Sequence, residues 1–91
     1  MPGLGRGHLD ASCRDRAAAV LTALGGPANV VEIEACITRL RCEVRDSGLV
    51  DEPALRAAGA HGVMRRGPVV QVVLGPEADA VVMEMSDLLG D

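Results

Sequence analysis

The sequence predicts an α+β domain in which a four-stranded antiparallel sheet carries three helices on one face. Two pairs of strand-like segments are each joined by a very short connection, which is typical of antiparallel hairpins. Three further segments have apolar residues at helical spacing and predict amphipathic helices. The expected order is α-β-β-α-β-β-α, and an antiparallel sheet tolerates the open second face that this arrangement leaves.

The first helix is predicted over residues 12–24. A Gly-rich segment, residues 1–9, precedes it and is expected to form a flexible lead. Ser12 or Asp10 offers a capping side chain at the start, and Gly25 follows the predicted end. The remaining residues, 10–91, are expected to form one domain, because a chain of 91 residues leaves little room for a second. The apolar stripe expected to face the core consists of Cys13, Ala17, Val20, Leu21 and Leu24.

The first hairpin is predicted from strands at residues 30–35 and 39–45, with only residues 36–38 between them. Apolar and charged residues alternate in both strands, so each strand is expected to have one buried and one exposed face. The residues expected to face the core are Val31, Ile33, Ala35, Leu40, Cys42 and Val44. Those expected on the exposed face are Glu32, Glu34, Arg39, Arg41, Glu43 and Arg45.

The second half of the chain repeats the pattern. Asp51 is expected to cap a short helix that ends at Gly59. Strands at residues 63–66 and 69–74 form the second hairpin, and residues 77–89 form the last helix. We expect the open face of the sheet to expose valines such as Val30 and Val73 to partner proteins.

Composition excludes several classes of function. The formal net charge is −4 and aromatic residues make up 0% of the chain, which disfavours nucleic-acid binding. No apolar run approaches the ~20 residues that span a bilayer. The three cysteines have irregular spacing, which indicates neither a disulfide framework nor a zinc site. We therefore expect a cytoplasmic domain without metal or cofactor.

The residues with the clearest chemical potential surround Cys36. This thiol is expected at the tip of the first hairpin, followed by Arg39 and Arg41, which leave the sheet on the same side. Nearby positive charge favours a thiolate, and guanidinium groups and free turn amides bind phosphate-like anions. Two simpler interpretations remain open at this point. A single cysteine is more often a buried apolar residue, and alternating arginines are usually a solvated strand face.

Residues 35–41, Ala-Cys-Ile-Thr-Arg-Leu-Arg, resemble the signature of the IIB domain of the sugar phosphotransferase system, in its glucose and N-acetylglucosamine branch. The similarity extends over nearly the whole chain from about residue 20. It includes residues 24–26, 29–30, 50–51, 54–55, 59–63, 67, 70–72 and 74–76.

The resemblance implies a phosphotransferase that works with two partners. A IIA protein presents a phosphohistidine, Cys36 accepts the phosphoryl group as phosphocysteine, and a membrane IIC permease offers its bound sugar as acceptor. Phosphate handling is then expected from Arg39, Arg41, Thr38 and Gln71, with Glu34 and Ile37 in supporting positions. The domain is expected at the cytoplasmic side of the membrane, held there through IIC. The motif favours glucose or N-acetylglucosamine without separating them.

Four questions stay open. Glu34 stands where many relatives carry Asp. The segment Met64-Arg65-Arg66 is more basic than the corresponding segment of many relatives, and it forms either a solvated strand end or a contact for an acidic partner. The role of His61 and the choice between a free-standing protein and a domain of a fused permease are also undecided. Two alternatives to the transferase are a non-catalytic regulator on the same fold and a redox-sensing cysteine protein. The redox sensor is disfavoured because Cys42 is expected on the opposite face from Cys36.

Overall fold

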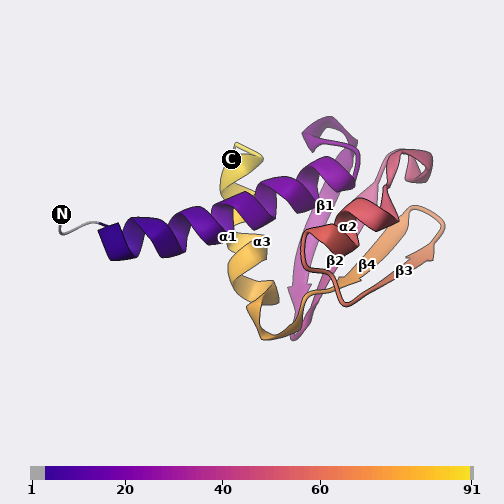
Figure 1. The fold of residues 1–91 in the computed structure, drawn as a ribbon. Coiled ribbons are helices and arrows are strands. Elements are labelled where there is room, and N and C mark those ends of the chain that lie inside the picture. The colour runs from indigo at the N-terminus through magenta and orange to yellow at the C-terminus, as the bar shows by residue number, and fades with distance from the viewer. Residues whose placement is uncertain (1–3, 91) are drawn as a thin grey trace.

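The fold follows the predicted order. A computed structural model describes the backbone of residues 4–90 and the side chains of residues 14–90. Single-turn 3-10 helices precede β1, α2 and α3. The principal elements are α1 (Leu4–Ala23), β1 (Val30–Cys36), β2 (Arg39–Val44), α2 (Glu52–Ala57), β3 (Gly62–Arg66), β4 (Val69–Val73) and α3 (Ala78–Leu88) (Figure 1).

Helix α1 begins at Leu4, eight residues before the predicted start, so Ser12 and Asp10 lie inside the helix and do not cap it. No proline interrupts residues 4–23, and adding residues to an existing helix is far easier than starting one. The flexible lead proposed for residues 1–9 stays a prediction, and residues 1–3 and the side chain of Cys13 lie outside the described part of the structure.

The end of α1 and the start of α2 agree with their sequence signatures. Gly25 has a φ of 107°, and the N–H groups of Gly25 and Gly26 donate to the carbonyls of Thr22 and Leu21, a Schellman ending. The Asp51 carboxylate accepts a hydrogen bond from the Ala54 N–H at 3.1 Å, which confirms the predicted cap.

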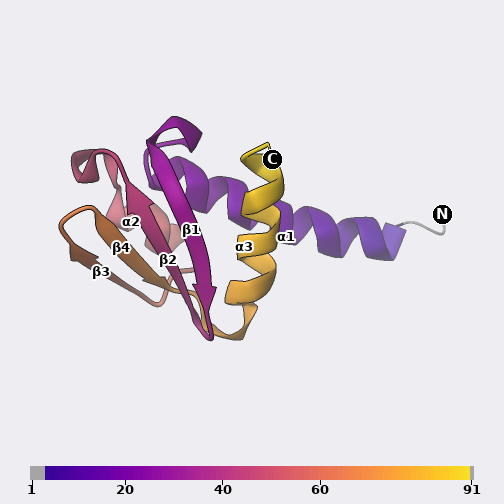
Figure 2. The ribbon, with the colours of Figure 1, turned by 180° about the vertical axis from the view of Figure 1, so that it is seen from behind.

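The four strands form one antiparallel sheet in the order β1-β2-β4-β3. Leu40, Cys42 and Val44 of β2 are buried, as the alternation predicts. Viewed from behind, the strands lie in front of α1 and α2, so the described helices leave this face of the sheet open (Figure 2). The one-sided architecture predicted from the sequence is confirmed.

One predicted inward residue, Val31, is instead 48% exposed. The pairing with β2 shifts between Val30 and Glu32, because a β-bulge leaves Val31 without a direct partner. Val30 therefore takes the inward position opposite Val44 and packs against the core, contrary to the prediction that it would be exposed. From Ile33 onward the predicted alternation holds.

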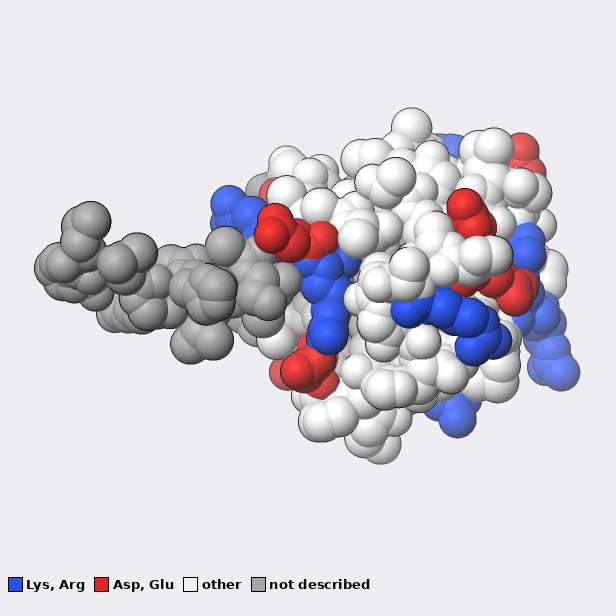
Figure 3. Space-filling view, viewed as in Figure 1, with Lys and Arg blue, Asp and Glu red and all other residues white. Residues whose placement is uncertain are grey.

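A single apolar core lies between the sheet and the three helices. Its largest fully buried side chains are Leu24, Leu40, Leu55, Leu74, Met85, Val20, Val44, Val70, Val72, Val81 and Cys42. Ion pairs from Arg14 to Glu84 and from Arg16 to Glu77 connect α1 to the segment that contains α3. On the helix side, positive and negative side chains are interspersed among uncharged surface (Figure 3).

Asn29 is the buried polar residue that joins α1 to the first hairpin, and it is only 4% exposed. Its Nδ2 donates to the carbonyls of Leu24 at 2.7 Å and Asp46 at 3.0 Å, while its Oδ1 accepts from the Asp46 N–H at 2.8 Å. A Cβ at Gly25 would lie 2.5 Å from Asn29 Nδ2, so the network also requires glycine there. Both N–H groups and the Oδ1 atom of the Asn29 side chain thus have hydrogen-bond partners.

We predict that Asn29→Ala lowers the free energy of unfolding by about 2–4 kcal/mol, because it leaves buried backbone groups without partners. Urea denaturation followed by far-UV circular dichroism measures the change. Thr22→Ala, an exposed substitution on α1, serves as the control and should change stability by about 0.5 kcal/mol or less. A loss as small as the control's for Asn29→Ala would contradict the assigned role.

Candidate functional site

The loop of the first hairpin contains two residues, Ile37 and Thr38. Cys36 is the last residue of β1 and lies directly opposite Arg39, so it occupies the strand end and not the loop tip that the sequence predicted. Ile37 has a φ of 57°, the positive value that the first position of a two-residue hairpin loop requires. For a β-branched residue this conformation is strained, at a cost of about 1–3 kcal/mol.

The hairpin loop is fixed to the end of β4. The Thr38 carbonyl accepts two backbone hydrogen bonds, from Leu74 N at 2.9 Å and Gly75 N at 3.0 Å. In the described residues, the N–H groups of Ile37 and Thr38 donate to no turn or loop carbonyl. Two free amides next to an exposed thiol are available as hydrogen-bond donors to an anion.

The strand register arranges the outward side chains of the open face in three rows. Each row crosses the sheet in the order β1, β2, β4, β3. The first row is Cys36, Arg39, Val73 and Gly62; the second is Glu34, Arg41, Gln71 and Met64; the third is Glu32, Glu43, Val69 and Arg66. The structure thus brings Cys36, both arginines, Glu34 and Gln71 onto one surface, as predicted.

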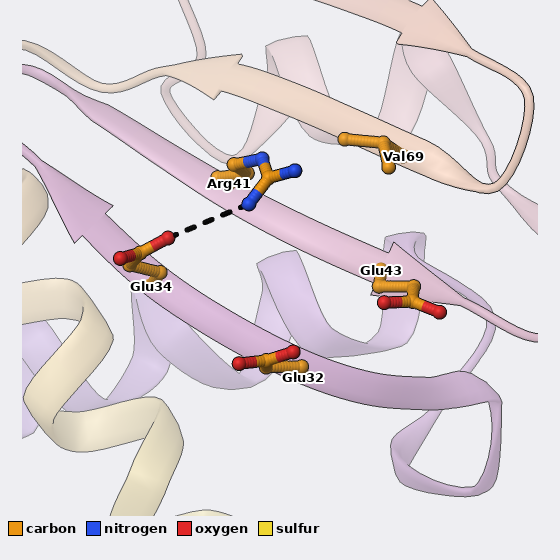
Figure 4. Close-up of a pocket in the computed structure, with 5 residues that line it drawn as sticks. All are labelled: Glu32, Glu34, Arg41, Glu43 and Val69. Atoms are coloured by element: carbon orange, nitrogen blue, oxygen red, sulfur yellow. Dashed lines mark ion pairs between the residues drawn. The ribbon is translucent and has the colours of Figure 1, made fainter.

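The two arginines have different partners. Arg39 Nη1 donates to Gln71 Oε1 at 3.2 Å and lies 4.0 Å from the sulfur of Met64. Arg41 Nη1 lies 3.6 Å from Glu34 Oε1, and both side chains are largely exposed to solvent (Figure 4). Arg39 lies opposite Cys36 in the register and directs its guanidinium group toward β4 and β3 without an ion pair in the described residues, whereas Arg41 shares its charge with a carboxylate.

Charge on the open face changes along the strands. The row that contains Cys36 carries one arginine and no acid, and the next row carries the Arg41–Glu34 pair. In the third row, Glu32 and Glu43 lie side by side on β1 and β2 (Figure 4). An anion on this part of the sheet is therefore favoured at the Cys36 end and repelled at the opposite end.

Cys36 and Cys42 lie in opposite environments. Cys36 is exposed, whereas Cys42 is 0% exposed in the core. Burial, and secondarily the charge of Glu43, raises the pKa of the Cys42 thiol to about 11. Of these two thiols, only Cys36 is accessible for chemistry with a partner.

The remaining candidate residues have separate positions. Arg65 pairs with Glu52 at 3.2 Å and donates to the Ser47 carbonyl, so it binds within its own chain and is not a free contact. Arg66 lies on the open face, beside a hollow of about 390 Å³ whose wall also includes Met64 and Gln71. The His61 N–H donates to the Val73 carbonyl at 2.8 Å. In the described residues, no group of three or more His, Cys, Asp or Glu side chains is arranged to hold a metal.

Comparison with known proteins agrees with this geometry. The model of the family "phosphotransferase system, EIIB" matches residues 18–51, which contain the first hairpin. The PTS system N-acetylglucosamine-specific EIIB component of Streptomyces coelicolor is 51% identical over 74 residues, which cover 81% of this chain and 96% of that protein. The chain belongs to the EIIB family of the phosphotransferase system. As an EIIB component, it is a phosphotransferase component of a sugar uptake system, a class that acts together with IIA and IIC components.

A solved structure supports the EIIB fold. The crystal structure of one domain of the PTS system, IIabc component from Clostridium difficile, has a TM-score of 0.70 and 25% sequence identity, and the match covers 88% of this chain and 85% of that one. Within residues 4–90 of this EIIB chain, the helices are too short or too polar to cross a membrane.

The sequence indicated most of the residues around Cys36 but not Met64. Met64, treated in the sequence as part of a basic segment, faces Gln71 and contacts Arg39. Val73 lies directly opposite Arg39 on the open face, as predicted, and is partly buried. Counting alternate residues outward from each hairpin loop would have placed Met64 on this face.

We predict that an alkylating reagent at about pH 8 modifies Cys36 of the native EIIB chain and leaves Cys42 unmodified. Alkylation requires an accessible thiolate, and Cys42 is both buried and held in the neutral form. Peptide mapping by mass spectrometry assigns each cysteine separately. In urea both should react, which is the control, and equal native labelling of Cys42 would contradict the assignment.

Proposed function

We propose that Cys36 is the phosphoryl carrier of this EIIB chain. The observation that supports this most strongly is the position of its exposed thiol, opposite Arg39 and beside two free turn amides, on a sheet face that the described helices leave open. This position combines an attacking sulfur with hydrogen-bond donors for the oxygens of an incoming phosphoryl group.

The first transfer starts from a phosphohistidine on a IIA protein. The Cys36 thiolate attacks phosphorus in line with the leaving imidazole nitrogen, so an S–P bond forms as the N–P bond breaks. The imidazole retains the electron pair of the broken bond and is left as neutral histidine after protonation. Arg39 and the N–H groups of Ile37 and Thr38 stabilise the charge on the phosphoryl oxygens.

The second transfer delivers the phosphoryl group to a sugar held by the IIC permease. A sugar hydroxyl attacks phosphorus, an O–P bond forms, and the S–P bond breaks to regenerate the Cys36 thiolate. The hydroxyl proton leaves to solvent. We assign to Arg41 and Gln71, in the second row of the open face, the role of following the oxygens as they move away from sulfur. The ion pair with Glu34 supports a role for that carboxylate in holding Arg41 between transfers.

The proposed partners and sugar rest on the similarity to EIIB proteins. The proposed partners are a IIA phosphohistidine donor and a membrane IIC component, with this chain at the cytoplasmic side of the membrane through IIC. The similarity to an N-acetylglucosamine-specific EIIB component supports N-acetylglucosamine as the sugar. No metal or cofactor takes part in the proposed steps.

We predict that the chain gains about 80 Da, the mass of one phosphoryl group, when it is incubated with phosphorylated general proteins and a charged IIA. Intact-mass spectrometry measures the gain. Cys36→Ser should show none, whereas Cys42→Ala, the matched control in the core, should be phosphorylated like the wild type. Phosphorylation of Cys36→Ser, or none of the wild type by a IIA proven to be charged, would contradict the proposal.

A second prediction concerns the positive charge. Arg39→Gln should slow phosphoryl transfer by about 100-fold, because it removes a charge-assisted donor from the transition state. Quench-flow measurement of phosphocysteine formation and discharge determines the rate of each transfer. Arg56→Gln, an exposed arginine of α2 on the helix side, is the control and should transfer at the wild-type rate. Equal rates for the two variants would show that Arg39 has no part in the transfer.

A further inference from the structure

We propose that Ile37 is the apolar anchor by which the IIA phosphohistidine donor docks onto this chain, an inference that rests on the proposed function of Cys36. Ile37 is 87% exposed, the highest exposed fraction among the large apolar residues that the structure describes as exposed. It belongs neither to the core nor to the side chains packed against it. An exposed apolar side chain of this size contributes nothing evident to the fold.

The backbone conformation at Ile37 makes isoleucine an unexpected residue at this position. Its φ of 57° is a conformation that glycine or asparagine adopts with little strain and that a β-branched residue adopts only with strain. The hairpin geometry alone would therefore favour a different residue. Strain combined with apolar exposure at one position points to a requirement outside the folded chain.

The backbone next to this side chain is tied to the rest of the sheet. Ile37 directly follows Cys36, and the next residue, Thr38, is fixed by the two hydrogen bonds to its carbonyl. The loop backbone is thus attached to the end of β4, which reduces the ordering that partner binding requires. Preorganised apolar side chains of this kind are typical of interface anchors.

The surroundings fit a protein surface that carries a phosphohistidine. In-line attack by Cys36 requires the imidazole to approach the end of the first hairpin, where Ile37 projects. The imidazole is carried on the surface of a folded donor protein, so the surface around it is brought against Ile37 during the first transfer. Arg39 supplies a charged rim beside the anchor, which resembles the apolar centre and polar edge of transient interfaces. We therefore assign Ile37 to the donor step, and the separate measurement of discharge to sugar on IIC tests this assignment.

The test uses Ile37→Asn, which removes the apolar group and accepts a positive φ, and Ile37→Val, which keeps the anchor β-branched and apolar. Met83→Gln is the matched control, because Met83 is a large apolar residue on α3 that is 67% exposed. For each variant the measurements are the melting temperature, the KM and kcat for phosphorylation by charged IIA, the rate of discharge to sugar on IIC, and the alkylation rate of Cys36.

For Ile37→Asn we expect the KM for charged IIA to rise about tenfold or more, a larger factor than any change in kcat, in the discharge rate or in the alkylation rate, because the variant keeps the backbone N–H of residue 37 and removes only the apolar side chain. The melting temperature should be equal to that of the wild type or higher by up to about 4–8 °C, because strain is relieved. Ile37→Val and Met83→Gln should both show a near-wild-type KM.

An unchanged KM for Ile37→Asn overturns the docking proposal, as does an effect confined to discharge or a melting temperature clearly below that of the wild type. If the wild type itself is not phosphorylated on Cys36 by charged IIA, the proposed function fails, and the docking proposal fails with it. Because the wild-type reaction is measured in the same series, the two failures are distinguished.

Discussion

The arrangement of the site depends on the register between β1 and β2, which the two-residue loop sets. Side chains alternate between the faces of a strand, so a shift of one residue would exchange the core and the open face. The observed register places Leu40, Cys42 and Val44 inside and leaves Arg39 and Arg41 outside, opposite Cys36 and Glu34. Burial of the three apolar side chains thus also positions the polar groups of the site.

The architecture separates stability from chemistry. The helices and the inward side of the sheet form the core, and Asn29 satisfies the polar backbone groups where α1 meets the first hairpin. The outward side contributes little to the core and is free to carry a thiol, arginines and an amide. At the hairpin loop, Ile37 has a strained positive φ, so the residue present is not the one that would give the loop the greatest stability.

The fold was predictable because its patterns are local. Alternation in the strands, the short hairpin connections and the Asp51 cap each depend on a few neighbouring residues, and the order of elements follows from them. The bulge at Val31 was not predictable, since no glycine or proline marks it and it appears only when β1 is paired with β2. The early start of α1 was not predictable either, because the glycines near its start weaken a helix without excluding it.

For the site, the sequence predicted which residues share the open face but not how they pair. Arg39 pairs with Gln71 and Arg41 with Glu34, and both pairs depend on the register across three strands. Arg65 illustrates the limit, because its partners Glu52 and Ser47 come from a segment whose position relative to β3 only the tertiary fold determines. The resemblance to the EIIB family indicated phosphoryl transfer, and the strand register determines how the site residues are arranged.

The central claim is that a phosphoryl group on Cys36 is held by the turn amides of Ile37 and Thr38 together with Arg39. The most direct measurement is a comparison of ¹H–¹⁵N spectra of the chain before and after phosphorylation by charged IIA. We expect the largest changes on the Ile37 and Thr38 amides and on the side-chain nitrogens of Arg39. Unchanged turn amides, or changes centred on the helices, would contradict it.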